Sequence, residues 1–228
     1  MLISFAKLPE RMQNQSVKVY YDILAKKRTE LVFKRLFDIL VSFVMLVLLS
    51  PLFLFIAVRI KLDSSGPVFF RQKRFTSYMR EFQIFKFRSM VDMAELQGPL
   101  VTVDNDSRIT EIGKWLRGSR MDEIPQLINI LLGDMSFVGT RPEVGKYVEQ
   151  YNDEMLATLL MPAGVTSLAS IKFKDEADML ENAGDADEVY VKDILPLKMK
   201  YNLEYIKKFG FLSDIKLMLS TVKAVSEE

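Results

Sequence analysis

The chain has 228 residues and a formal net charge of +1, which suits one domain with a sizeable core and gives no reason to expect a nucleic-acid partner. It contains neither cysteine nor histidine. These absences exclude a disulfide framework, a thiolate nucleophile and an imidazole base, so any chemistry must use carboxylates, hydroxyls, lysines, arginines or a metal bound by oxygen.

The chain begins with a polar leader, residues 1–33, that carries no motif. Within it, SVKVYYDILAKKRTELVF predicts a helix whose aromatic and basic side chains could lie on a membrane surface. A partly disordered arm is the alternative interpretation.

An uncharged apolar run follows at residues 39–58, and about twenty such residues are the usual length of a transmembrane helix. Ser50 and Pro51 interrupt it, and a proline inside a helix removes a backbone hydrogen bond and bends the helix. Each half would then be about 16 Å long, roughly half of the hydrocarbon core. The run begins too late for a signal peptide, and no small-residue cleavage site follows it.

Basic side chains flank the apolar run on both sides, and such charges tend to stay in the cytoplasm. We therefore predict a re-entrant helix-break-helix hairpin over residues 34–62 that enters and leaves the membrane by the same face. A kinked full span and a buried core helix are the alternatives. The flanking cations are Lys26, Lys27, Arg28, Lys34 and Arg35 before the run, and Arg59, Lys61, Arg71, Lys73 and Arg74 after it.

The remaining residues, 63–228, predict an α/β cytosolic domain that is mostly helical with a few short strands. Turn residues followed by apolar ones predict a short strand within residues 64–74. Alternation of apolar and polar residues predicts a second, half-buried strand within residues 80–90. A loop over 96–110, a helix that ends at Gly133 and a short strand from 135 follow. Further helices are expected at about 144–160, at 187–209 and, with amphipathic spacing, at 211–225, where the helix would pack on the domain or rest on the bilayer.

Two adjacent acids, Asp122 and Glu123, precede the helical stretch IPQLINILL. One interpretation makes Asp122 the N-cap of that helix, because an acid just before a helix with a proline in its first turn is an ordinary helix start. Capping leaves Glu123 without a role and does not explain the cations nearby.

In the predicted arrangement of elements, these cations lie in turns or at strand ends that are next to the segment with the two acids. Each of them, taken singly, is best explained as a solvated surface charge. Arginines that converge with a helix N-terminus, however, form a receptor for phosphates, where an acid would be kept ionised and hence nucleophilic or metal-binding. The cations are Lys86, Arg88, Arg117, Arg120 and Arg141.

Several motifs in order, KRLFDIL…SP, FKFRSM, DSRIT.IGKWLR, MDEIPQLINILLGDMSFVG.RPE and YNLEYI…SDIKLML, closely resemble the bacterial sugar transferases that prime polysaccharide assembly. These are the monotopic phosphoglycosyl transferases, and the resemblance covers about residue 34 to the C-terminus. It implies a catalytic domain on the cytoplasmic face of the bacterial inner membrane, held in the membrane lipid by a re-entrant hairpin broken at Ser-Pro.

The resemblance also implies a mechanism and a set of site residues. Asp122 would be the nucleophile that attacks the phosphate bonded to the sugar of a UDP-sugar, releases UMP and carries a covalent phosphosugar, which undecaprenyl phosphate then accepts. Mg²⁺ would lie beside Asp122, and Glu123 would handle protons or align the nucleophile. A homodimer is compatible with the family. The implied substrate-binding residues are Lys86, Arg88, Arg117, Arg141, Pro142 and Lys174.

The chain departs from the common family pattern at GTRP and PAGVTSLAS, in a region tied to substrate binding. A subfamily with a different sugar or a weakened enzyme would explain such changes. The competing functions are a non-catalytic membrane protein that binds polyprenyl phosphate or assembly partners, and a sugar-donating glycosyltransferase that releases UDP instead of UMP. The departures are Thr140, Ala163, Ser167 and Ser170.

Overall fold

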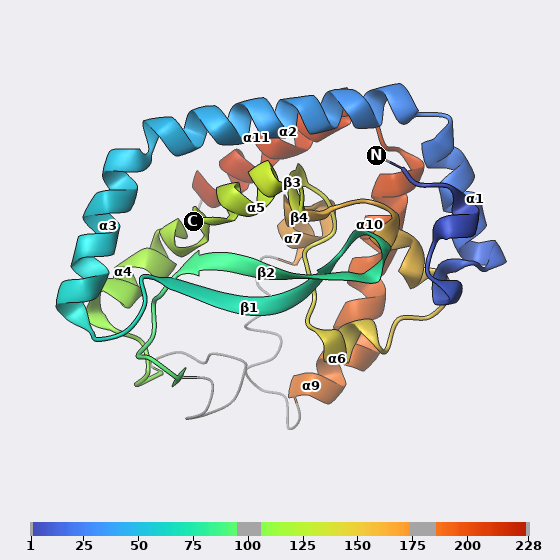
Figure 1. Ribbon diagram of the computed structural model, residues 1–228. Helices are drawn as coiled ribbons and strands as arrows, with labels where there is room; N and C mark the ends of the chain where they lie inside the picture. The colour runs from blue at the N-terminus through green and yellow to red at the C-terminus, as the bar shows by residue number, and fades with distance from the viewer. Residues whose placement is uncertain (1, 95–105, 174–185, 227–228) are drawn as a thin grey trace.

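The computed structural model describes residues 2–94, 106–173 and 186–226, and within them the predicted α/β, mostly helical architecture with a few short strands is confirmed (Figure 1). Two small sheets lie among the helices. Strands β1 (Phe69–Thr76) and β2 (Arg80–Phe87) form an antiparallel hairpin, whereas β3 (Met135–Val138) and β4 (Ala163–Thr166) pair in parallel. The helices are α1 (Gln15–Ala25), α2 (Arg28–Leu48), α3 (Ser50–Asp63), α4 (Glu111–Gly118), α5 (Gln126–Leu132), α6 (Gly145–Val148), α7 (Leu168–Lys172), α9 (Ala186–Val189), α10 (Leu195–Lys207) and α11 (Phe211–Ser226).

The chain breaks at Leu49, between α2 and α3, and the predicted break residues Ser50 and Pro51 are the first two residues of α3. The two helices form one edge and one side of the molecule in Figure 1. Pro51 has no N–H for the carbonyl of Val47, four residues earlier, and the Ser50 hydroxyl donates to that carbonyl instead, at 2.8 Å. No single described helix is long and apolar enough to cross a bilayer, but α2 and α3, bent by 61° at the break, meet that criterion together by length and composition.

The two helices extend beyond the apolar run, so the expectation of two short halves is wrong. Helix α2 has 21 residues and begins at Arg28, inside the predicted leader. Its buried side chains are polar, namely Lys34, Asp38 and Ser42, and they face the domain. Arg35 donates to the carbonyls of Ile130 and Leu131 at the end of α5, so α2 is fixed to the domain by polar contacts.

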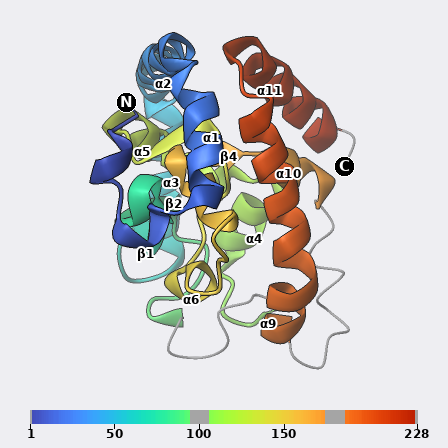
Figure 2. The ribbon, with the colours of Figure 1, turned by 90° about the vertical axis from the view of Figure 1, so that its right-hand side faces the viewer.

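The leader is part of the main hydrophobic core, which differs from the arm and membrane-surface interpretations. Helix α1 buries Val17, Tyr20, Tyr21 and Leu24, and they pack in one cluster with side chains of α10 and of the 3₁₀ helix Met155–Leu160. Figure 2 shows α1 in front of the domain, beside α10. The predicted helix at 16–33 is therefore two helices, and the first one packs on protein.

The single helix expected at 144–160 is divided into α6 and the 3₁₀ helix Met155–Leu160. Arg11 donates to the carbonyls of Glu149 and Tyr151, and Asn152 accepts from the N–H of Met155. These side chains bond the backbone groups that a continuous helix would pair internally. The helix expected at 187–209 is present, with a π-helical turn at Tyr190–Ile194 just before Pro196, whose missing N–H disturbs the regular pattern.

The amphipathic helix α11 is present where it was expected and contacts α2, α7 and β3. Helix α5 ends at Gly133, which has a left-handed φ of 89°, as predicted. Together α2, α5 and β3 form the frame that holds the segments on either side of α5, and those segments carry the candidate site.

Candidate active site

A cavity of about 910 Å³ lies between the β1–β2 hairpin, the 3₁₀ turn Met121–Glu123, the segment after β3 and helix α10. Asp122 lines it. Among the described residues, nine cationic and three acidic side chains line the walls, so the cavity suits an anionic ligand. The cations are Arg71, Arg74, Lys86, Arg88, Arg108, Arg117, Arg141, Lys146 and Lys198, and the acids are Asp92, Asp122 and Glu143.

The interpretation of Asp122 as a helix N-cap is wrong. Helix α5 begins at Gln126 after Pro125, and no side chain caps its N-terminus. Asp122 lies instead in the 3₁₀ turn that follows Arg120, whose left-handed φ of 55° turns the chain sharply after α4. The carboxylate is therefore available to the cavity.

The neighbouring acid, Glu123, binds two of the predicted cations. Its Oε1 lies 2.6 Å from Nζ of Lys86 and 2.7 Å from Nη2 of Arg141. Burial alone would raise the pKa of Glu123, but Arg141 and Lys86 together hold it well below the ordinary value. Glu123 is thus ionised, and it joins strand β2 to the turn that follows β3.

Asp122 has a different environment. Its Oδ2 lies 4.0 Å from Nζ of Lys86. Burial raises the pKa of Asp122, Lys86 and Arg117 oppose this shift, and the adjacent charge of Glu123 adds to it. We expected the cations to keep an acid at this place ionised. This holds for Glu123, whereas Asp122 is the more basic carboxylate of the two.

Arg88 lines the cavity, but its guanidinium is bound by protein. It donates to the carbonyls of Ser64 and Ser65 and to the Ser64 hydroxyl, which fixes the connection between α3 and β1. Gly66 in that connection has φ 116°, and a Cβ there would lie 2.0 Å from the guanidinium. The observed contacts of Arg88 therefore hold the wall next to the hairpin.

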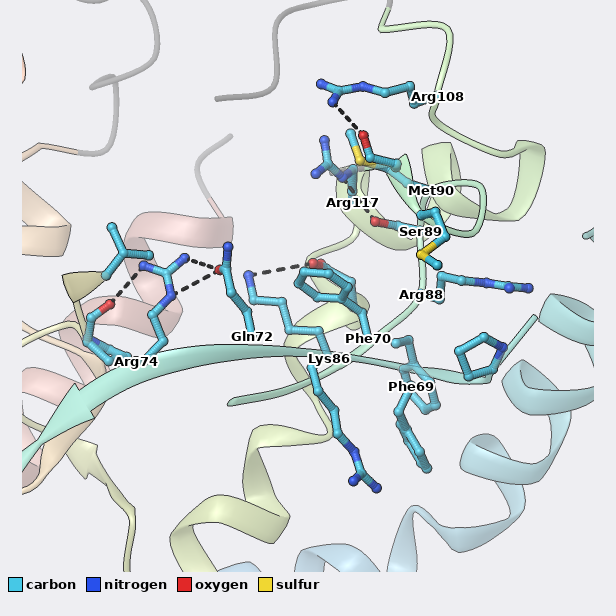
Figure 3. Close-up of a pocket in the computed structure, with 18 of the residues that line it drawn as sticks. Phe69, Phe70, Gln72, Arg74, Lys86, Arg88, Ser89, Met90, Arg108 and Arg117 are labelled. Atoms are coloured by element: carbon cyan, nitrogen blue, oxygen red, sulfur yellow. Dashed lines mark hydrogen bonds and ion pairs between the residues drawn. The ribbon is translucent and has the colours of Figure 1, made fainter. Parts of the chain in front are cut away.

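The other predicted binding residues lie on both sides of Lys86. Nε of Arg117 donates to the Ser89 hydroxyl at 3.1 Å, close to Arg108 (Figure 3). Pro142 lines the cavity, and its carbonyl accepts from Arg74 at 3.2 Å. Lys174 lies outside the described residues.

Sequence reasoning missed several polar residues that line the cavity. Phe70 of β1 is opposite Lys86 of β2, so Phe70, Gln72 and Arg74 share the face of Lys86, as Figure 3 shows. Because side chains alternate between the two faces of a strand, the predicted strand within residues 64–74 could have indicated that Phe70, Gln72 and Arg74 lie on one face. The α10 side had no such signal, because Tyr190 and Lys198 come from distant parts of the chain.

The four departures from the family pattern make structural contacts and do not belong to the described lining of the cavity. The carbonyl of Thr140 accepts from Gly164, Ala163 pairs with Met135 in the parallel sheet, and Ser167 caps α7 by accepting from the N–H of Ser170. Their direct effect is on the β3–β4 sheet and the start of α7.

Comparison with known proteins gives a consistent result. A family model described as bacterial sugar transferase matches residues 29–228. Over 196 residues the chain is 37% identical to the UDP-glucose:undecaprenyl-phosphate glucose-1-phosphate transferase of Klebsiella pneumoniae, covering 84% of this chain and 40% of that protein. It is also 37% identical to a UDP-N-acetylgalactosamine-undecaprenyl-phosphate N-acetylgalactosaminephosphotransferase of Aeromonas hydrophila, covering 84% and 43%.

A shorter relative matches over nearly its full length. The exopolysaccharide production protein PSS of Rhizobium leguminosarum bv. phaseoli is 36% identical over 201 residues, covering 85% of this chain and 94% of that protein. The chain therefore spans roughly two fifths of the first two relatives and almost all of the third.

Proposed function

Because the chain belongs to the bacterial sugar transferase family, we propose that it transfers a sugar 1-phosphate from a UDP-sugar to undecaprenyl phosphate and releases UMP. The observation that carries this proposal is the position of Asp122 in a cation-rich cavity, next to a glutamate that is ion-paired with Lys86 and Arg141.

In the first step an oxygen of the Asp122 carboxylate attacks the phosphorus bonded to the sugar. The bond from that phosphorus to the bridging oxygen breaks, UMP leaves with the electron pair, and a phosphosugar remains on Asp122 as an acyl phosphate. The raised pKa of Asp122 favours this role, because a more basic carboxylate is the stronger nucleophile once it is ionised.

The cations supply the charge that this step needs, because a carboxylate and a diphosphate repel each other. Lys86 lies within 4.0 Å of Asp122, and the charge of Arg117 also acts on that carboxylate. Arg141 is held at the cavity by Glu123. A preorganised set of cations stabilises the developing charge on the phosphoryl oxygens without reorganisation during the reaction.

We also propose Mg²⁺ as the cofactor, with Asp122 as its carboxylate. The described residues contain no cluster of three or more acidic side chains that could enclose a metal ion. A magnesium ion here would therefore need substrate phosphates and water as its other ligands, as is common for this metal. When bound, it would neutralise phosphate charge; the binding and alignment of the diphosphate are the work of Lys86, Arg117 and Arg141.

In the second step a phosphate oxygen of the lipid attacks the phosphorus of the acyl phosphate, and the bond to Asp122 breaks. The carboxylate is restored and the polyprenyl diphosphate sugar is formed. This step requires the cavity to lie at a membrane surface, where the headgroup of the lipid acceptor can reach Asp122.

We propose that α2 and α3 provide this location as a re-entrant hairpin in the bacterial inner membrane, with the domain on the cytoplasmic face. From residue 34 onward, helix α2 reverses the pattern of a soluble protein: its fully buried side chains, Lys34, Asp38 and Ser42, are polar, and most of its apolar side chains are exposed. In water these exposed groups would be unfavourable, whereas in lipid they are favoured. Exposed examples are Leu36, Leu40, Phe43, Val47 and Leu48 on α2, and Leu54, Phe55, Val58 and Leu62 on α3.

The experiment that tests this function identifies the nucleotide released. Purified protein in lipid nanodiscs with undecaprenyl phosphate and a panel of UDP-sugars should release UMP from at least one of them. Release of UDP would indicate a sugar-donating glycosyltransferase. Binding of the lipid without release of either nucleotide would favour the non-catalytic alternative.

A further inference from the structure

The cavity extends from Asp122 in two directions along the hairpin. Arg74 is four residues beyond Phe70, the partner of Lys86, so it lies about 13 Å along the strand from the level of Lys86. Ser89 follows β2 at the opposite end. Figure 3 shows Arg74 and the pair of Ser89 and Arg117 on opposite sides of Lys86.

The two ends differ chemically. The end near Arg74, here called the tyrosine end, consists of Arg74, Glu143, Tyr147, Tyr190 and Lys198. The Tyr190 hydroxyl donates to Glu143 at 2.6 Å and accepts from Lys198 at 3.1 Å. The rings of Tyr147 and Tyr190 lie against each other, with their centroids 4.5 Å apart.

The opposite end, here called the serine end, consists of Ser89, Arg108 and Arg117. It supplies the Ser89 hydroxyl and the Arg117 guanidinium, whereas the Arg108 guanidinium is bound by Asp106. Asp92 also lines the cavity but is exposed to solvent, and the described lining has no tyrosine at this end. Such donors suit the phosphate of a leaving nucleotide.

The cations Arg74, Lys146 and Lys198 also line this end, but Lys198 lies 3.8 Å from Glu143 and Lys146 is ion-paired with Asp187. Because carboxylates already neutralise these two lysines, and because the buried carboxylate of Glu143, which is 7% exposed, would repel phosphate, the tyrosine end is the less suited to phosphate. A carboxylate accepts hydrogen bonds from hydroxyl groups, while tyrosine and lysine side chains donate to hydroxyl oxygens. Aromatic rings pack against the apolar C–H faces of such molecules. A neutral, polyhydroxylated ring fits this set of groups.

We infer that the tyrosine end binds the sugar ring of the donor and selects which UDP-sugar is transferred. This inference rests on the proposed function, because it assigns the sugar and the nucleotide to the two sides of Asp122. It names Glu143, Tyr190 and Lys198 as specificity-determining residues. A site built around buried hydrogen-bonding groups discriminates strongly between ligands that differ in one hydroxyl, since a mismatch leaves these groups unpaired.

The test compares the binding of UDP-glucose, UDP-galactose and UDP-N-acetylgalactosamine with that of UDP, by titration calorimetry on the full chain in nanodiscs. Every protein in this test carries Asp122→Asn, so that no UDP-sugar reacts during the titration. Glu143→Gln removes the charged acceptor and Tyr190→Phe removes one hydroxyl, so the second variant remains informative if the first fails to fold. Lys192→Gln is the control, because Lys192 follows Tyr190 closely on the same helical segment but is exposed.

Each cavity variant should change the ratio of affinities among the three UDP-sugars by about tenfold or more, and the affinity for UDP by less than about twofold. The control should change neither. An equal loss of affinity for UDP and for all three UDP-sugars would overturn the inference and would indicate that the nucleotide binds at this end. Unchanged affinity ratios would also overturn it, because the residues of the tyrosine end would then have a structural role only. Absence of UMP release by the wild type would refute the proposed function separately, since these binding ratios require no turnover.

Discussion

Glu123 and Arg141 are joined by an ion pair with 2.7 Å between Oε1 and Nη2, and they stand at the two ends of the segment formed by α5 and β3. The same oxygen of Glu123 also binds Lys86 on the hairpin. One carboxylate therefore fixes two cations from different elements beside Asp122. We therefore propose that Glu123 positions these cations, while the role expected from the sequence, in proton handling or in aligning the nucleophile, stays a prediction.

The first prediction concerns Arg141. Arg141→Ala should lower kcat/KM about a hundredfold, because loss of one cation contact in the transition state costs on the order of 3 kcal/mol. The fraction of protein in membranes should stay unchanged, since Arg141 contacts Glu123 and not the proposed hairpin. Lys114→Ala is the control, because Lys114 is an exposed cation of α4 outside the described lining of the cavity. Steady-state rates and membrane flotation measure the two quantities, and an equal loss in both variants would contradict the specific role of Arg141.

The second prediction is a shift in the pH–rate profile. Burial raises the pKa of Asp122 and the charge of Glu123 adds to this effect, so the rate should fall on acidification at a higher pH than an ordinary aspartate would give. In Glu123→Gln that negative charge is absent and Lys86 is no longer neutralised by Glu123. The ionised form of Asp122 is then favoured, its pKa falls, and the acidic limb of kcat/KM should move to lower pH. A limb that moves upward would contradict the assigned charges.

Local patterns predicted those parts of the structure that depend on neighbouring residues. Alternation marked the hairpin strands, Gly133 marked the end of α5, and Pro51 marked the break between the apolar helices. The predicted helix at 144–160 failed because Arg11, far away in the sequence, bonds its backbone carbonyls. The sequence around residues 144–160 contains no feature that predicts this contact with Arg11.

In the candidate site, too, local motifs predicted some features and missed those that depend on distant segments. Motifs identified Asp122, Glu123 and four of the nine cations in the described lining, but they did not show that Arg88 is bound to the connection before β1. They also did not find the tyrosine end, because Glu143 and Lys198 meet only when α10 packs behind the segment after β3. Tertiary contacts between distant segments decide both points.

The third prediction concerns the buried pair that fixes α2 to α11. Lys34 lies 2.5 Å from Asp214, both side chains are almost fully buried, and the Tyr205 hydroxyl also donates to Asp214. Lys34→Met leaves a buried carboxylate without its cation and should lower the free energy of unfolding by about 3–5 kcal/mol. Lys208→Met breaks the exposed pair with Glu204 and should cost at most about 1 kcal/mol. Chemical denaturation in detergent measures both, and equal effects would contradict the importance of burial.

The fourth prediction follows from the break between α2 and α3. Tags at residues 1 and 228 should both be accessible only from the cytoplasm. Replacing Ser50 by Leu and Pro51 by Ala restores an N–H for the Val47 carbonyl and removes the competing hydroxyl, so the helices should straighten towards a full span. A full span that moves the N-terminal tag across the membrane must also pull α1 out of the hydrophobic core, so the crossing should be accompanied by a loss of stability. Cysteine-accessibility labelling of engineered tags measures this. Ser50→Ala alone, which keeps the proline, should leave the topology unchanged; an accessible periplasmic tag in the wild type would refute the hairpin.

The last prediction separates chemistry from structure at Asp122. No helix N-terminus depends on this side chain, so Asp122→Asn should leave folding and membrane binding unchanged, as thermal unfolding and flotation can show. An amide cannot form the acyl phosphate, so turnover should fall by several orders of magnitude. Wild-type protein incubated with labelled UDP-sugar in the absence of lipid acceptor should release UMP and retain labelled sugar phosphate on the peptide that contains Asp122. Glu123→Gln should retain the label but acquire it more slowly, because the attachment site remains while Lys86 and Arg141 lose their common anchor. Near wild-type turnover by Asp122→Asn would end the proposed mechanism, since the other described carboxylate beside Lys86, Glu123, is ion-paired with Lys86 and Arg141 and is not in the described lining of the cavity.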